Sequence, residues 1–166
     1  MGLYDAVDRS GHGRRREKTL RKPLLAAGAV IAAVVALAVW ACRYQMQYRD
    51  YVAILTDATR AARRTGSFTV TVDGDAVPAD ADDLSSLLWL ITDAGAGRTG
   101  AAPQTVPAIT IDYGNGTVLE IWQVPLTNPA NDWTEGPYFC CTDPDGGRYG
   151  YDTDQIPMTS LTRLFS

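Results

Sequence analysis

The longest apolar run of the sequence, Leu24–Cys42, limits what the rest of the chain can be. Its nineteen residues include no charged side chain. As an α-helix they would extend about 28 Å, close to the thickness of a bilayer's hydrocarbon layer. A helix in the core of a soluble protein would usually carry a polar face. The run therefore predicts a transmembrane anchor at residues 23–42 that contacts lipid through residues 24–42.

The charges on either side of this run differ in sign. Residues 1–22 carry seven Lys or Arg against three acids, a net of +4, and six of the seven lie between Arg14 and Lys22. From Arg43 onward there are eight Arg and sixteen Asp or Glu, a net of −8. Positive charge near a span stays on the cytoplasmic side. We expect a disordered cytoplasmic tail at residues 1–22 and a single-pass protein of a bacterial cell membrane, with residues 43–166 outside.

Side chains suited to the membrane–water interface flank the run. Aromatic rings and long basic side chains favour the headgroup layer. The expected interface residues are Arg21 and Lys22 on the inner side, and Trp40, Tyr44 and Tyr48, together with Tyr51, on the outer side.

A cleaved lipoprotein signal is the alternative to an uncleaved anchor. Val39–Cys42 places a small residue before a cysteine, as bacterial lipoprotein cleavage sites do. Trp40 is bulky where such sites need a small residue, and the 22 residues before the apolar run are long for a signal peptide. We therefore expect a retained signal-anchor, with lipid attachment at Cys42 as the alternative.

A juxtamembrane helix is predicted at residues 43–65. Residues 45–64 contain no Pro or Gly, and Gly66 is a good helix stop. An apolar stripe at helical spacing comprises Met46, Val52, Leu55, Ala58 and Ala62. The stripe is narrow and short for a coiled coil, so we expect a spacer that packs on its own domain. An oligomerisation helix is the alternative.

Residues 66–166 are predicted to form an extracytoplasmic α+β domain. The periodicity indicates a strand at 68–72 and a helix after Asp80 or Asp82 whose inner face holds Leu84, Leu87, Leu88 and Ile91. Two hairpins follow, around residues 114–116 and 143–147, and then a short helix after Pro157. The predicted order is β-α-β-β-β-β-α, with a mainly antiparallel sheet of four or five strands.

The composition of this domain excludes several kinds of catalysis. Residues 43–166 contain no His and no Lys, because His12, Lys18 and Lys22 all precede the apolar run. Ser-His-Asp triads, Cys-His pairs and Ser-Lys dyads need one of these side chains as base. Glu120 and Glu135 are the only glutamates available for paired-carboxylate chemistry. We expect no enzymatic activity and no cofactor.

Two short motifs contain residue types that can form sites. Asp143, Asp145, Asp152 and Asp154 fall within twelve residues and are weak candidates for binding calcium, although Arg148 stands where an EF-hand loop needs glycine. A solvated hairpin turn is the simpler interpretation. Cys140 and Cys141 are adjacent in a predicted strand, so they should face opposite ways and form no disulfide. The excess of acids argues against nucleic-acid binding.

These features predict a membrane-anchored, non-catalytic module that binds a protein partner in or on the membrane, or serves as an accessory subunit of a cell-envelope complex. One alternative is a filament subunit with an architecture similar to a pilin, since a basic leader precedes a long helix whose first half is apolar. The pilin processing site and the glutamate at the start of the span are missing. Another alternative is a calcium- or ligand-binding sensor ectodomain.

Overall fold

The structure, a computed structural model, describes residues 11–95, 101–126 and 133–166, with side chains described from Leu25 onward. Helix α1 (Gly11–Thr65) is 55 residues long. The chain divides into two compact units, which we call the N-terminal unit (residues 1–45) and the C-terminal unit (residues 46–166). Helix α1 supplies residues to both.

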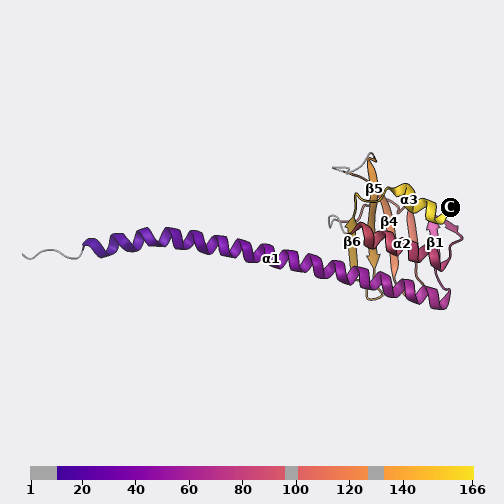
Figure 1. Cartoon of the computed structure of the whole chain (residues 1–166), viewed down its shortest axis with the longest axis horizontal. Helices are drawn as coiled ribbons and strands as arrows, with labels where there is room; N and C mark the ends of the chain where they lie inside the picture. Colours follow the sequence, from indigo (N-terminus) through magenta and orange to yellow (C-terminus); the bar gives the residue numbers. More distant parts are fainter. Residues whose placement is uncertain (1–10, 96–100, 127–132) are drawn as a thin grey trace, which may run out of the picture. The chain divides into compact units, whose positions relative to one another are not determined.

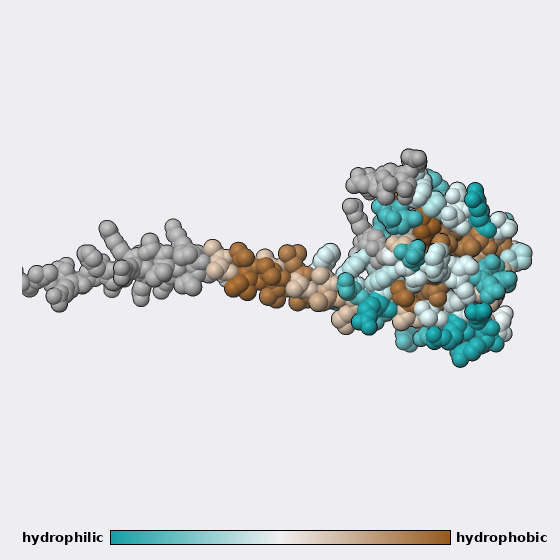
Figure 2. All heavy atoms as spheres, viewed as in Figure 1, coloured by the Kyte–Doolittle hydropathy of each residue, from teal (hydrophilic) through white to brown (hydrophobic). Residues whose placement is uncertain are grey.

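The N-terminal unit is the apolar part of α1. Side chains from Leu25 to Arg43 are exposed, and this part appears as the brown band in Figure 2. Within the described residues, one helix is long and apolar enough to cross a membrane, with a mean hydropathy of 2.5 over its most apolar window, none of which is buried. The apolar helix expected from the sequence is therefore present.

The C-terminal unit contains an open antiparallel sheet. Its strands are β1 (Thr69–Val72), β2 (Asp75–Val77), β3 (Ile109–Asp112), β4 (Val118–Pro125), β5 (Glu135–Thr142) and β6 (Arg148–Asp152). They lie in the order β2-β1-β3-β4-β5-β6, and each neighbouring pair is antiparallel. The predicted α+β class is confirmed.

The predicted strand number and order need a correction, because the sheet has six strands and begins with a hairpin. Asp73 and Gly74 both have positive φ, 52° and 89°, which closes a tight turn between β1 and β2. Strand β2 is three residues long and mostly exposed at the sheet edge, so it lacks the alternation that marks a half-buried strand. The described elements therefore run β-β-α-β-β-β-β-α after α1.

Helices cover one face of this sheet (Figure 1). They are the second half of α1, α2 (Ala81–Ala94), and the short α3 (Met158–Thr162) with the 3₁₀ turn η1 (Arg163–Phe165). Of the two predicted caps, Asp80 is the one that caps α2. Its carboxylate accepts from the backbone N–H groups of Asp82 and Asp83, and the Asp80 N–H donates to the Asp83 carboxylate. Fully buried strand residues facing the helices include Ile109, Ile111, Leu119, Ile121 and Cys141.

The second half of α1 belongs to the core of the C-terminal unit. Leu55, Ala58 and Ala62 from the predicted stripe are each at most 1% exposed. Met46 was predicted to share that stripe, and this was wrong, since its side chain is 63% exposed. The buried residues of α1 begin at Tyr51, more than one helical turn after Met46.

Tyr51 also departs from its predicted place at the membrane interface. Its side chain is 1% exposed, and its ring centre lies 4.9 Å from that of Tyr151 in β6. Tyr48, one turn earlier in α1, contacts Tyr151 edge-on with ring centres 5.7 Å apart. These rings join the helix to the sheet edge, and the sequence signal for aromatic residues near a span did not distinguish this packing from a lipid interface.

The turn between β3 and β4 provides a test of the fold. Gly114 has a φ of 70°, and a Cβ there would collide with the Ser67 carbonyl oxygen, whereas at Gly146, with a φ of 87°, a Cβ would meet open space. We expect Gly146→Ala to cost about 1–2 kcal/mol, from the left-handed backbone alone. Gly114→Ala should cost more because the clash adds to that strain. Denaturant unfolding of both full-length variants measures the difference, and equal costs would contradict the close approach to Ser67.

Candidate functional site

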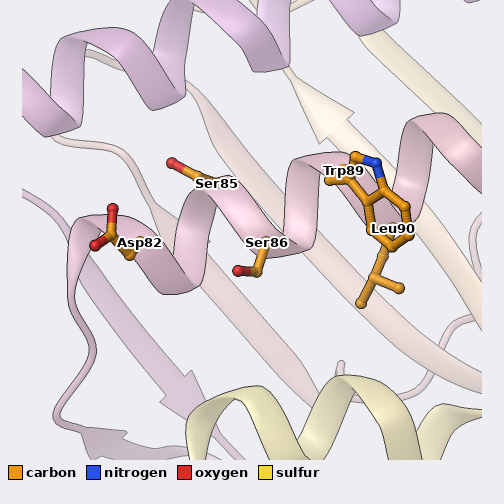
Figure 3. A pocket seen from close by; sticks show the side chains of 5 residues that line it. All are labelled: Asp82, Ser85, Ser86, Trp89 and Leu90. Atoms are coloured by element: carbon orange, nitrogen blue, oxygen red, sulfur yellow. The ribbon is translucent and has the colours of Figure 1, made fainter.

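The exposed side of α2 carries a shallow groove. It is lined by Asp82, Ser85, Ser86, Trp89 and Leu90 and has a volume of about 570 Å³. We call these five residues the α2 groove; Figure 3 shows them along the helix, with the Trp89 ring beside Leu90. Trp89 is 62% exposed, unusually open for an indole.

Helical periodicity explains why these side chains share one side. Leu84, Leu87 and Ile91 are buried on the inner face of α2, as the sequence predicted, whereas Leu88, predicted to share that face, is only half-buried. The exposed positions follow a second stripe with spacings of four, three and four residues: Asp82, Ser86, Trp89 and Asp93. The two small serines leave the hollow in front of the Trp89 ring.

The helix that carries the groove is acidic. Helix α2 contains three aspartates and no basic residue. Asp82 accepts a bond from Arg63 of α1 at 3.2 Å, and both side chains are exposed. Asp93 stands in the last turn of α2, where the helix dipole disfavours a negative charge, and it makes no ion pair with any residue the structure describes.

The sheet face opposite the helices carries a smaller cluster. Trp122, Tyr138 and Cys140 are buried together there. They lie on this face because they alternate along β4 and β5 with the residues that face the helices. The indole N–H of Trp122 donates to the Thr105 carbonyl at 2.8 Å, so the loop before β3 covers this part of the sheet. The cluster is therefore packed and hydrogen-bonded rather than open to a ligand.

An arginine lies beside this cluster. Arg148 Nη2 is 3.2 Å from a Glu120 carboxylate oxygen and 3.4 Å from Cys140 Sγ. Glu120 and Cys140 are directly opposite each other in the β4–β5 pairing. The arginine thus joins two neighbouring strands on a partly exposed face, and exposed ion pairs of this kind contribute about 0–1 kcal/mol.

The aspartates considered for calcium do not converge. The Asp143 carboxylate stabilises its own turn. It accepts hydrogen bonds from the backbone N–H groups of Asp145 and Gly147, with N···O distances of 2.9 and 2.7 Å. Asp152 ends strand β6, and about four residues of strand, roughly 13 Å, separate it from that turn. Asp154 contacts the Gln155 amide beyond the strand. Within the described residues no three His, Cys, Asp or Glu side chains lie together as metal ligands, so calcium binding stays a prediction.

The three cysteines are free thiols in this structure. Cys42 is exposed, while Cys140 and Cys141 are buried. The last two face opposite sides of β5, as predicted, because Cys141 belongs to the core under the helices and Cys140 to the cluster with Trp122. Burial, with smaller contributions from Cys140 and Asp143, raises the pKa of the Cys141 thiol from about 9.0 to about 12.

This shift predicts a loss of stability at alkaline pH. Because the folded-state pKa is raised, the thiol stabilises the fold fully below its ordinary pKa of about 9.0, and this contribution is lost as pH rises toward about 12. Burial also raises the pKa values of Tyr51 and Tyr113, which adds to the decline. Urea unfolding from pH 7 to 11 should give a falling free energy. Cys141→Ala should make the free energy of unfolding fall less steeply with pH. An unchanged pH dependence in this variant would contradict the raised pKa of Cys141.

The predicted interface residues fall in different parts of the structure. The Trp40 and Tyr44 rings stack in the N-terminal unit with centres 6.2 Å apart, and Trp40 is 67% exposed. Tyr48 packs in the C-terminal unit as described. The side chains of Arg21 and Lys22 lie outside the described residues.

Known proteins give no further guidance. The chain matches no family model, no curated protein and no solved structure. The function must therefore be inferred from the groove and the anchor. Trp89 was not among the predicted site residues, although helical spacing indicates its exposure: once Leu84, Leu87 and Ile91 define the inner face, position 89 must point outward.

Proposed function

We propose that this protein is a membrane-anchored, non-catalytic module that holds its C-terminal unit on the extracytoplasmic side and binds a protein partner there. The observation that carries the proposal is the difference in side-chain exposure between the two parts of α1. Its first part exposes an uninterrupted apolar surface, whereas its second part buries Leu55, Ala58 and Ala62 in a folded unit. One helix therefore serves as both anchor and core element.

The orientation and the non-catalytic role are supported by the sequence. The excess of Lys and Arg before the span favours a cytoplasmic N-terminus. Residues 43–166 have no His or Lys to act as a base. The α2 groove has one carboxylate, two hydroxyls and an indole, a composition suited to binding rather than to proton transfer at neutral pH.

A subunit of a surface filament is the second candidate. It is favoured by the length of α1, 55 residues, with an apolar first part and a sheet packed against the second part. The acidic C-terminal unit counts against it, because copies with the same negative charge repel at close range.

Cross-linking in native membranes followed by mass spectrometry separates these candidates. We expect one membrane or envelope protein to be recovered in a fixed ratio to the chain, and absent from cells that lack the chain. Adducts of the chain only with itself, in many copies, would support the filament. Reproducible absence of any adduct would contradict the proposed function.

A further inference from the structure

We infer that the α2 groove is a docking site for a cationic polypeptide segment, one that places an Arg or Lys beside an apolar side chain. This inference rests on the proposed function and names the chemistry of the partner. Its basis is the combination of an open indole, a hollow made by small residues, and carboxylates at both ends of the same helical stripe.

The first step is the exposure of Trp89. Single exposed apolar side chains are common and need no explanation. Trp89, however, forms one wall of a hollow of about 570 Å³, and Leu90 adds apolar surface beside it. Ser85 and Ser86 supply no bulk one turn earlier, so a partner side chain can reach the face of the indole (Figure 3). Tryptophans in such hollows are frequent energetic centres of protein interfaces.

The second step is the charge around the ring. Asp82 lies about two turns before Trp89 and Asp93 about one turn after it, on the same exposed stripe. An indole face attracts a guanidinium or ammonium group, and adjacent carboxylates strengthen the attraction. Arg63 already contacts Asp82 at 3.2 Å, which shows that a guanidinium can reach that end. Asp93 is the end that a partner's cation would neutralise.

The third step concerns which polypeptide fits. Residues 43–166 carry a net charge of −8, so the same part of a second copy would bring more acids to the acidic helix α2. A segment rich in Arg or Lys is complementary to it, and charge complementarity of this kind mainly sets specificity and association rate. The chain's own basic segment, residues 1–22, lies on the other side of the membrane in the proposed orientation. The occupant is therefore a basic segment of a different protein.

Selection from phage-displayed random dodecapeptides tests this inference directly. The full-length chain is held in nanodiscs of phosphatidylcholine, which has no net charge, and peptides that bind empty nanodiscs are removed first. We expect the enriched peptides to carry net positive charge, with an Arg or Lys within two residues of an apolar side chain. Their affinity should fall with salt.

Matched variants assign the binding to the groove. Trp89→Ala should weaken the enriched peptides at least tenfold, and Trp89→Phe should keep most of the affinity. Asp93→Asn should weaken them several-fold and reduce the salt dependence. Val106→Ala is the control, since Val106 is 83% exposed in the loop that covers Trp122, away from α2, and should have no effect. Unchanged melting temperatures would show that the variants fold.

Several outcomes would overturn the inference. They are enrichment of neutral or acidic peptides, no enrichment over empty nanodiscs, or binding that Trp89→Ala leaves intact. The proposed function can fail independently, because it is tested by native cross-linking. If cross-linking recovers a partner but the selection enriches no cationic peptides, the proposed function is supported. The α2 groove would then not be the site where that partner docks.

Discussion

Replacing Val34 and Leu37 together by aspartate should remove the protein from the membrane fraction. The protein should then appear in the soluble fraction or be degraded. Both side chains are exposed, 60% and 65%, in the middle of the apolar part of α1. A carboxylate at the centre of a spanning helix costs about 2.5–3.5 kcal/mol on insertion scales, so two should cost roughly twice that. Carbonate extraction of membranes followed by immunoblotting measures the retained fraction.

The matched control replaces the same two residues by alanine. It removes bulk but adds no charge, and alanine is well tolerated in a helix. We expect this variant to be retained in the membrane fraction to the same extent as the unsubstituted chain. If the aspartate variant also stayed, apolar contact with lipid could not be what holds the protein there.

Leu55→Ala should destabilise the C-terminal unit by about 2–5 kcal/mol, the range for large-to-small substitutions in packed cores. Leu55 is 1% exposed, and the cavity left behind would lie in the core shared by α1 and the sheet. Denaturant unfolding of the full-length chain, followed by near-ultraviolet circular dichroism, measures the loss.

Met46→Ala is the comparison within the same helix. Met46 is 63% exposed, nine residues earlier, and its replacement should change the free energy of unfolding by less than about 0.5 kcal/mol. Similar effects at the two positions would contradict the packing of α1 on the sheet.

Much of the fold could be predicted because its signals are local. Asp80 with Asp83 marks the start of α2, Gly114 and Gly116 mark a hairpin, and Pro157 precedes the last helix, where Met158 and Leu161 are buried. Each signal depends on residues within a turn of each other, so no tertiary information was needed.

The remaining features depend on contacts between distant segments. Strand β2 is stabilised by pairing with β1, and its exposed residues, Asp75 and Ala76, show no pattern of their own. Tyr51 could be read as an interface ring because its partner Tyr151 is a hundred residues away. Helical periodicity alone could have predicted that Trp89 is exposed. The hollow beside it could not be predicted, because its shape depends on how the side chains pack in three dimensions.

The most direct test of the central claim, an uncleaved anchor with the C-terminal unit outside, is cysteine accessibility in intact cells. In a Cys42→Ser background, single cysteines are placed at exposed Asp145 and, separately, at Ser10, and a membrane-impermeant maleimide is added. Cys140 and Cys141 are buried and should react slowly. We predict labelling of Asp145→Cys without permeabilisation and labelling of Ser10→Cys only after it. For the unsubstituted chain, which keeps Cys42, we predict a mass that includes the N-terminal tail. The reverse pattern, or a chain shortened before residue 42, would contradict the account.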